Sequence, residues 1–469
     1  AINAKGGNIS LSTDKLNLAG TNDTISSVGG TFTLKSYLNS STICLGNNSG
    51  CTMNLPSSYF AGSTAVFQPN FGMITFGSTF QSGNITVNSG ATVSDVLTIT
   101  SPLTLQSSTD SLGANGRVWI YGKITDNGNT NNPGALYVKT YSAYGSLDQA
   151  LAGGSAVIIQ TVGPQYYSSI YPWNANNPSS FSATTTGANS SITIGDIETA
   201  DAGVKTISFT SAKNIIFLAN SGAYNGGNAS KNVLTFTATG AIDMTAGNYR
   251  LDSLGGSTTL TADAMYLSAG GNRIASTNNG LLTIQAKTNS TPICINSPQV
   301  CSSSGINLER FVMDYVIDST FGGVQIGNAS AIGGITINNP SNSAGQNILY
   351  SNAALYLAQN TGAGGALGGD ITLYGTLNIP STGVNAAYNN NNANLPIYTW
   401  ATQTTQFDPT KVYGFDFYEL SSGSFNLSGN LYAAHRIITG SSIKVGASST
   451  VLSVSQDLNV GGYFELSLL

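Results

Sequence analysis

The most constraining feature of this sequence is a long internal duplication. The segment Gly6–Leu18 aligns with Gly255–Leu267, which lies 249 residues further along the chain, and after about residue 26 the separation becomes 250. At that separation the alignment continues to Ile85–Asn88 and Ile335–Asn338. A chain built by copying a long segment is typical of repeat and fibre architectures, in which each structural unit stacks on its neighbour.

The composition indicates a chain that has a core but carries few charges. Hydrophobic residues make up 41% of the 469 positions, charged residues only 8%, and the formal net charge is −5. Disordered chains combine low hydrophobicity with high net charge, so we expect a folded chain whose surface is largely hydroxyl and amide groups. The 16 lysine and arginine residues are scattered singly, which argues against a nucleic-acid partner. No apolar run approaches the roughly 18 residues that a membrane span needs.

Short triplets, in which two apolar residues flank a polar one, recur from end to end of the chain. Each is typical of a minimal β-strand with two side chains inward and one outward. Strands this short bury too little in isolated hairpins, whereas winding them into coils pairs each strand with the coils above and below. We therefore predict an all-β fold, a right-handed parallel β-helix (solenoid) with short helical turns and surface loop excursions. Its first segment is 1–254, and its duplicated second segment, continuous with the first, is 255–469. The triplets are Ile9-Ser10-Leu11, Leu16-Asn17-Leu18, Phe32-Thr33-Leu34, Ile74-Thr75-Phe76, Ile85-Thr86-Val87, Leu97-Thr98-Ile99, Leu103-Thr104-Leu105, Ile192-Thr193-Ile194, Ile207-Ser208-Phe209, Leu234-Thr235-Phe236, Leu282-Thr283-Ile284, Ile371-Thr372-Leu373, Leu377-Asn378-Ile379 and Leu458-Asn459-Val460.

Four segments interrupt the recurrence of these triplets. Ser146–Leu151 and Asn307–Phe311 are predicted to form short helical turns, the first with a serine as its N-cap. The stretches Pro164–Pro178 and Tyr388–Trp400 are predicted to be surface loops rich in aromatic residues. Such residues offer large contact areas and stack on sugar rings, although packing over the coil or against a neighbouring molecule is the alternative. The candidates for surface binding or assembly are Tyr166, Tyr167, Tyr171, Trp173, Tyr388, Tyr398 and Trp400.

The cysteines form two pairs with the same spacing at the same place in both copies, Cys44 with Cys51 and Cys294 with Cys301. Local pairing within each loop is the simplest interpretation, and it predicts two disulfides and an oxidising, extracellular location. A zinc site is the alternative. It would require two distant pairs to meet, and the usual C-x2-4-C spacing is absent.

Signals for catalysis are weak. His435 is the only histidine and has no nucleophile motif around it. β-Helical lyases and glycosidases work with paired carboxylates, and with few acidic residues in the chain small clusters arise by chance. We predict no catalytic residue, no metal and no cofactor, and therefore not an enzyme. The three densest acidic groups are Asp196, Glu198 and Asp201; Asp408, Asp416 and Glu419; and Glu309, Asp314 and Asp318.

Several sequence segments resemble the filamentous haemagglutinin family, the β-helical exoproteins of bacterial two-partner secretion and related autotransported adhesins. Gly145–Val157 is similar to the family's short helix followed by A-G-x-x-V, and Ser191–Ile197 to its strand-and-turn continuation. The chain also resembles a recurrent element of the family, in which L-x-R is followed by L-x-I-G and then by G-x-I-T-V. The matching segments are Leu308–Phe311, Val324–Asn328 and Gly334–Ile337. The NPNL-like and NPNGI-like motifs of the family's secretion domain are not present. The chain is then either an internal or processed segment of a longer exoprotein or a complete protomer with open coil ends.

These observations lead to two functional hypotheses. The first is a non-enzymatic extracellular structural or adhesive β-helix protein of bacterial surface fibre type, located at the cell surface and stacking end to end into a filament. Its partners would be other copies of itself, in axial or lateral assembly, and host or matrix glycans or proteins. The second is a polysaccharide-degrading β-helix enzyme, a lyase or glycosidase, in which Asp196 and Asp408 would be the residues to replace first.

Overall fold

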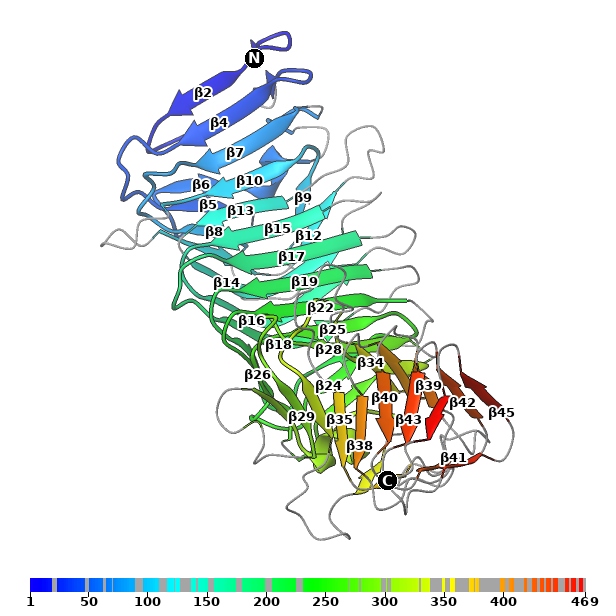
Figure 1. The fold of residues 1–469 in the computed structure, drawn as a ribbon. Helices are drawn as coiled ribbons and strands as arrows, with labels where there is room; N and C mark the ends of the chain where they lie inside the picture. The colour runs from blue at the N-terminus through cyan, green and yellow to red at the C-terminus, as the bar shows by residue number, and fades with distance from the viewer. Residues whose placement is uncertain are drawn as a thin grey trace. The chain divides into compact units, whose positions relative to one another are not determined.

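A computed structural model gives the fold, which consists of short parallel strands stacked into long ladders (Figure 1). The chain forms two compact units, Ala1–Thr235 and Phe236–Leu469. The predicted segment boundary after residue 254 stays a prediction. After residue 337 only the backbone of the strands is described. The described residues are 1–18, 23–46, 50–61, 65–69, 71–88, 96–108, 116–121, 123–126, 136–140, 142–150, 156–173, 179–198, 205–224, 231–268, 270–277, 280–296, 301, 305–328, 330–337, 348–350, 355–358, 371–374, 376–378, 397–400, 405–408, 417–419, 424–427, 431–433, 436–439, 442–445, 452–454, 457–460 and 464–466.

In the first unit two long ladders form two faces of each coil. The first ladder contains β2 (Ile9–Ser12), β4 (Thr31–Lys35), β7 (Met73–Gly77), β10 (Leu103–Gln106), β13 (Leu136–Thr140), β15 (Ala156–Thr161), β17 (Ser179–Thr185) and β19 (Lys205–Ser211), each parallel to the next. The second contains β6 (Met53–Leu55), β5 (Ile43–Leu45), β8 (Ile85–Val87), β11 (Arg117–Ile120), β14 (Ser142–Ala150), β16 (Gln165–Trp173), β18 (Ile192–Glu198) and β20 (Ile215–Phe217).

Shorter pairings form a third face. β9 (Val96–Ile99) pairs with β12 (Lys123–Asp126), which pairs with the end of β14, and β21 (Gly222–Tyr224) pairs with the end of β18. β1 (Ile2–Asn3) pairs with β3 (Ile25–Ser26). Consecutive strands such as β10, β11 and β12 therefore lie on different faces, while strands one coil apart pair in parallel. This arrangement is the predicted parallel β-helix.

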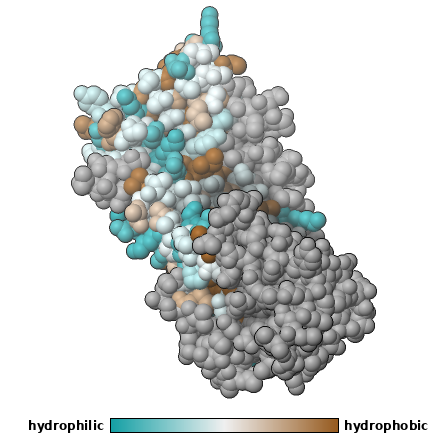
Figure 2. All heavy atoms as spheres, viewed as in Figure 1, coloured by the Kyte–Doolittle hydropathy of each residue, from teal (hydrophilic) through white to brown (hydrophobic). Residues whose placement is uncertain are grey.

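The core of the first unit consists of side chains stacked in register. In the first ladder Ile9, Phe32, Ile74 and Leu103 occupy one inward position in successive coils, and their exposed fractions are 9% or less. Each large apolar side chain removed from water contributes about 1.5–3 kcal/mol. The polar residue of each triplet, such as Thr33, is directed outward and is partly exposed. The face of this unit seen in Figure 2 is accordingly pale to hydrophilic, with small scattered apolar patches.

The second unit repeats this plan with two long ladders. One contains β25 (Thr258–Thr261), β28 (Leu281–Gln285), β31 (Gly323–Gly327), β34 (Leu355–Ala358), β37 (Ile397–Trp400), β39 (Phe417–Glu419), β42 (Arg436–Thr439) and β45 (Asp457–Val460). The other contains β30 (Ile306–Leu308), β29 (Ile293–Ile295), β32 (Ile335–Ile337), β35 (Ile371–Tyr374), β38 (Thr405–Asp408), β40 (Ser424–Leu427), β43 (Ser442–Val445) and β46 (Phe464–Leu466). Shorter parallel pairs are β23 (Ala241–Asp243) with β26 (Ala264–Tyr266), β24 (Arg250–Asp252) with β27 (Arg273–Ala275), β33 (Ile348–Tyr350) with β36 (Thr376–Asn378), and β41 (Leu431–Ala433) with β44 (Leu452–Val454). β22 (Val233–Ala238) spans the boundary between the units.

The duplication in the sequence is a duplication of backbone structure. Strands β2, β4, β7 and β8 correspond, residue for residue, to β25, β28, β31 and β32. The structural correspondence begins one residue before the sequence alignment. Lys5 and its equivalent Leu254 both have a positive φ, as do Gly6 and Gly255. One isolated bridge is also repeated, Ile25 with Phe67 and Ile274 with Ile317.

The short helical turns lie elsewhere than predicted. Ser146–Leu151 was expected to be helical, but residues up to Ala150 belong to strand β14, between parallel neighbours β11, β12 and β16. An isolated helical turn would have left the hydrogen-bonding groups of those neighbours without partners. The turn predicted for Asn307–Phe311 begins later than expected: strand β30 ends at Leu308, Arg310 and Phe311 are helical, and the helical element η2 continues over Val312–Val316. A further turn, η1, spans Ser57–Tyr59.

Close approach of successive coils excludes side chains at two equivalent glycines. A Cβ atom added at Gly83 would lie 2.1 Å from the carbonyl oxygen of Ser41, and one added at Gly333 would lie 2.3 Å from that of Thr291. Both contacts are with backbone, so the coils themselves would have to move apart. These glycines are required by the distance between coils and not by the shape of a turn.

We predict that Gly83→Ala and Gly333→Ala each destabilise the protein by about 1–3 kcal/mol, because the added methyl group overpacks the space between two backbones. Gly270→Ala is the control, since a Cβ atom there meets nothing within 4 Å. Thermal unfolding followed by calorimetry measures the difference. Equal stability of all three variants would contradict the claim that coil spacing is fixed at these positions.

Candidate functional site

The first group of predicted surface aromatics lies in a strand and not in a loop. Gln165–Trp173 forms β16, which pairs with β14 and β18, so the loop predicted for Pro164–Pro178 is wrong over this range. Aromatic residues favour strands, and alternation places Tyr167 inside and Tyr166 outside. Tyr166 is 41% exposed. Tyr167 is buried and donates a hydrogen bond of 3.0 Å to Gln165 Oε1, and burial raises its pKa well above the ordinary value.

The remaining aromatic candidates are placed only in part. Tyr171 and Trp173 belong to β16, in register with Asp148 and Ala150 of β14. Tyr398 and Trp400 belong to β37, in register with Tyr356 and Ala358 of β34. Tyr388 lies outside the described residues. A role for these side chains in binding or assembly stays a prediction, but Tyr167 is not a surface residue.

Both predicted disulfides are present, Cys44–Cys51 with a Cα–Cα distance of 5.5 Å and Cys294–Cys301 with 5.7 Å. Each closes the connection between two strands that pair in parallel, β5 with β6 and β29 with β30. Parallel neighbours usually need a crossover of a dozen or more residues. In the first copy only residues 46–52 connect β5 to β6, so the disulfide closes an unusually short connection between two parallel strands. The disulfides indicate an oxidising environment.

Three acidic side chains of the predicted clusters, those of Asp196, Asp314 and Asp318, are engaged in structural contacts, whereas Glu309 is exposed. Asp196 accepts a hydrogen bond of 3.0 Å from the backbone N–H of Gly222. Asp314 pairs with Arg310 at 3.0 Å, and burial raises the pKa of its carboxyl against the opposing effect of that arginine. Asp318 forms an ion pair with Arg273. Asp408 and Glu419 are placed as backbone only, in β38 and β39, while Asp201, Asp416 and His435 lie outside the described residues.

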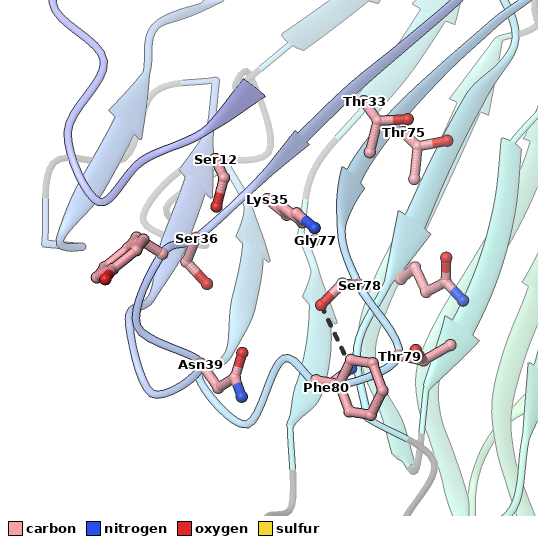
Figure 3. Close-up of a pocket in the computed structure, with 12 residues that line it drawn as sticks. Ser12, Thr33, Lys35, Ser36, Asn39, Thr75, Gly77, Ser78, Thr79 and Phe80 are labelled. Carbon is pink, nitrogen blue, oxygen red and sulfur yellow. Dashed lines mark hydrogen bonds between the residues drawn. The ribbon is translucent and has the colours of Figure 1, made fainter. Parts of the chain in front are cut away.

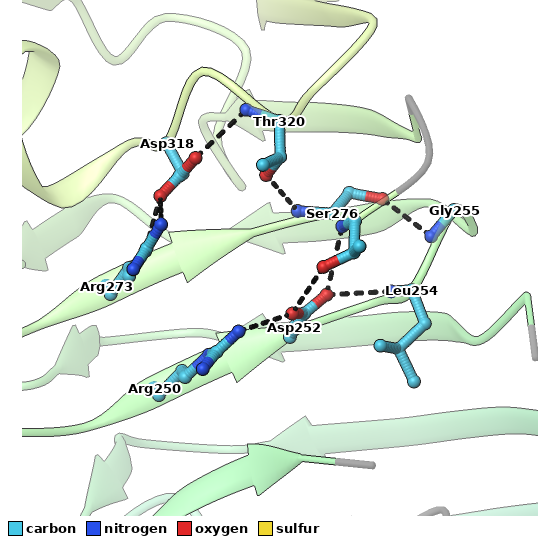
Figure 4. Close-up of polar contacts among 9 residues, drawn as sticks. Arg250, Asp252, Leu254, Gly255, Arg273, Ser276, Asp318 and Thr320 are labelled. Carbon is cyan, nitrogen blue, oxygen red and sulfur yellow. Dashed lines mark hydrogen bonds and ion pairs between the residues drawn. The ribbon is translucent and has the colours of Figure 1, made fainter. Parts of the chain in front are cut away.

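A polar network in the second unit ties three coils together (Figure 4). Asp252 accepts hydrogen bonds from Arg250 at 3.0 Å and from the backbone N–H groups of Leu254 and Thr277 at 2.9 and 3.2 Å. In the next coils Ser276 N–H donates to Thr320 Oγ1 at 3.0 Å, and Thr320 N–H donates to Asp318 at 3.0 Å. These carboxylates therefore hold turns in place, which is a structural role.

A pair of equivalent aspartates that sequence reasoning missed fastens one turn in each copy. Asp14 accepts hydrogen bonds from Leu38 N–H at 2.8 Å and Ser41 Oγ at 2.9 Å. Asp263 accepts bonds from Thr288 N–H at 2.7 Å and Thr291 Oγ1 at 2.9 Å. The signal was available, because both aspartates lie in the aligned segments, and Ser41 and Thr291, their hydroxyl partners, occupy equivalent positions 27 and 28 residues further on.

A groove on the outer face of the first unit was also missed. It has a volume of about 570 Å³ and lies over β2, β4, β7 and β10, between the turns that follow β4 and β7 (Figure 3). Thr33 and Thr75 are directly paired on adjacent strands and line it, together with Lys35, Tyr37 and Phe80. The groove combines hydroxyl groups with two exposed aromatic rings.

No protein-family model matches this chain, and neither a curated protein nor a solved structure does. The class of the protein therefore follows from its own geometry, which is that of a parallel β-solenoid with two disulfide-closed loops. In the part of the chain that the structure describes, no helix is long and apolar enough to cross a membrane.

We predict that Asp263→Asn lowers the stability of the second unit in a pH-dependent way. Burial of Asp263 raises the pKa of its carboxyl, but hydrogen bonds from Thr288, Thr291 and the backbone of Lys287 outweigh this, and the pKa lies below its ordinary value. A carboxyl with a lowered folded pKa stabilises the fold above its unfolded pKa of about 4, and this contribution is lost as pH falls through the folded pKa. The loss at pH 7 should be about 1 kcal/mol, since the group is partly exposed.

Thermal unfolding of Asp263→Asn and the parent protein between pH 7 and pH 2.5 tests this expectation. The difference in Tm should shrink below about pH 4. Glu309→Gln is the control, because Glu309 is an exposed carboxylate in the same unit. A difference in Tm that stays constant down to pH 2.5 would show that the ionised carboxylate does not fasten this turn.

Removal of one disulfide, with Cys44→Ala and Cys51→Ala together, should lower the free energy of unfolding by about 2–3 kcal/mol, because the unfolded chain regains the entropy of a short loop. The equivalent change at Cys294 and Cys301 should act similarly on the second copy. Calorimetry of both double variants, with free thiols counted by mass spectrometry after alkylation, provides the measurement. Unchanged unfolding would mean that the loops are held by their hydrogen bonds alone.

Proposed function

We propose that this protein is a non-enzymatic extracellular structural or adhesive β-solenoid of the bacterial surface fibre type, which stacks end to end with other copies of itself. The observation that carries the proposal is the in-register ladder of parallel strands, in which every strand is a template for one more. Stacked coils whose surface is rich in hydroxyl groups and carries few charges would provide length and contact area without strong charge repulsion between neighbouring molecules.

The internal duplication supports addition of strands at the first coil. Ile2 of the first copy is 45% exposed, whereas its counterpart Leu251 is fully buried. Leu16 is half-buried and lies outside any strand, whereas its counterpart Met265 is buried in β26 beside Ile242 of β23. The second copy therefore shows that the positions of Ile2 and Leu16 become buried when a further strand pairs with the coil that contains them.

The resemblance to the filamentous haemagglutinin family supports the same proposal and suggests a bacterial cell surface. The disulfides agree with an extracellular location, since they persist in oxidising compartments. The polysaccharide-degrading alternative has less support, because Asp196 serves a turn. Assays on acidic polysaccharides with Asp196→Asn and Asp408→Asn test it directly, and a loss of turnover in either variant would favour it.

Self-association is the prediction that follows from this proposal. We expect the protein to form higher oligomers as its concentration rises, and we expect Leu11→Asp with Leu16→Asp to weaken association at least tenfold, because inward-pointing charges block strand addition. Ser10→Asp is the matched control, since Ser10 lies on the same strand with its side chain exposed. Sedimentation velocity and light scattering measure the association.

The result that would overturn the proposal is a parent protein that stays monodisperse and monomeric at millimolar concentration. Equal weakening by Ser10→Asp would also count against it, because charge alone, and not the coil edge, would then control association.

A further inference from the structure

The groove over β2, β4, β7 and β10 holds two of the most exposed large apolar side chains in the described part of the chain. Tyr37 is 74% exposed and Phe80 is 73% exposed. They lie on turns that follow neighbouring strands of one ladder, and both line the same groove. Figure 3 shows Thr33 and Thr75 side by side along the groove and Phe80 at its end beyond Ser78. Apolar rings held in water at the rim of a polar groove are typical of a binding surface.

The second copy shows that the fold does not need these rings. At the positions equivalent to Tyr37 and Phe80 it has Lys287 and Ser330, both exposed. The two turns nevertheless keep the same backbone hydrogen bonds. Ser41 N–H donates to Leu38 O at 2.9 Å, as Thr291 N–H does to Thr288 O at 3.0 Å, and Gln81 N–H donates to Ser78 O at 3.0 Å, as Ala331 N–H does to Asn328 O at 3.0 Å. The aromatic rings are therefore additions to a turn that forms without them.

A buried polar network found only in the first copy fixes these turns to each other. Gln81 is completely buried; its side-chain amide donates to the carbonyl oxygen of Ser41 and accepts a hydrogen bond from Ser36 Oγ. The second copy replaces the Gln81 and Ser36 pair by Ala331 and Ala286, which cannot bond in this way. A satisfied buried network rigidifies its surroundings. The rings of Tyr37 and Phe80 are thus carried on two turns that are joined beneath the surface, which reduces the entropy lost when a ligand binds.

We propose that this groove binds a neutral polysaccharide chain. The faces of its pyranose rings would stack on Tyr37 and Phe80, and its hydroxyl groups would exchange hydrogen bonds with Thr33, Thr75 and the amide of Asn39. Lys35 is the one cation among the lining residues, so the groove lacks the cluster of positive charges that a polyanion requires. The site does not depend on self-association, since it lies on the outward face of the ladder and not on its inward-facing side chains.

The test is titration of the full chain with neutral hexasaccharides, namely cellohexaose, xylohexaose, maltohexaose and chitohexaose, by calorimetry and saturation-transfer NMR. We expect one or more of them to bind, and Tyr37→Ala or Phe80→Ala to weaken that binding about tenfold each. The double variant Tyr37→Lys with Phe80→Ser carries the residues of the second copy, so it should fold and lose binding. Tyr266→Ala, which removes an exposed tyrosine in the second unit, is the control and should bind as the parent does.

Three results would overturn the proposal. The first is that none of the four hexasaccharides binds at millimolar concentration. The second is that binding is unchanged in the Tyr37→Lys, Phe80→Ser variant while its melting temperature is that of the parent. The third is that only a polygalacturonate or heparin hexasaccharide binds, and that Lys35→Ala abolishes this binding while the aromatic variants keep it. Sedimentation of the double variant shows separately whether self-association is retained.

Discussion

Hydrogen bonding between successive coils is the interaction on which the rest of this structure depends. Strands in a ladder lie about 4.8 Å apart, and every strand uses its N–H and C=O groups on the coils next to it. This fixes the register, so that inward positions such as Phe32 and Ile74 stack directly on each other. It also leaves room for nothing but glycine at Gly83 and Gly333, where the backbones of two coils meet.

The two copies separate what the fold requires from what it tolerates. Features kept in both include the disulfide loops, the glycines at close contacts, and the aspartates Asp14 and Asp263 that fasten a turn. These residues satisfy backbone groups or close loops, and their roles are structural. Tyr37 and Phe80 belong to the other class, because exposed Lys287 and Ser330 replace them while the turns keep the same backbone hydrogen bonds.

Most of the ladder could be predicted from the sequence, and most of the candidate site could not. Each predicted triplet except Leu16-Asn17-Leu18 begins inside a strand, because alternation of apolar and polar residues is a local property of the chain. The aromatic stretch now seen as β16 was misjudged, since Tyr and Pro in a polar context resemble a loop until parallel neighbours are known. The groove was missed because Tyr37 and Phe80 are distant in sequence and line one groove only when two coils are stacked.

The sequence by itself determined the repeat, the inward and outward alternation of each strand, and the pairing of the cysteines, because all three depend on residues close together or on equal spacing in the two copies. Only the tertiary structure decided which apolar triplets become strands. Leu16-Asn17-Leu18 remains outside a strand, while the equivalent Met265 lies in β26, which pairs with β23. A segment of three residues has no intrinsic stability as a strand, so its conformation is set by whether a neighbouring coil supplies hydrogen bonds and an apolar surface.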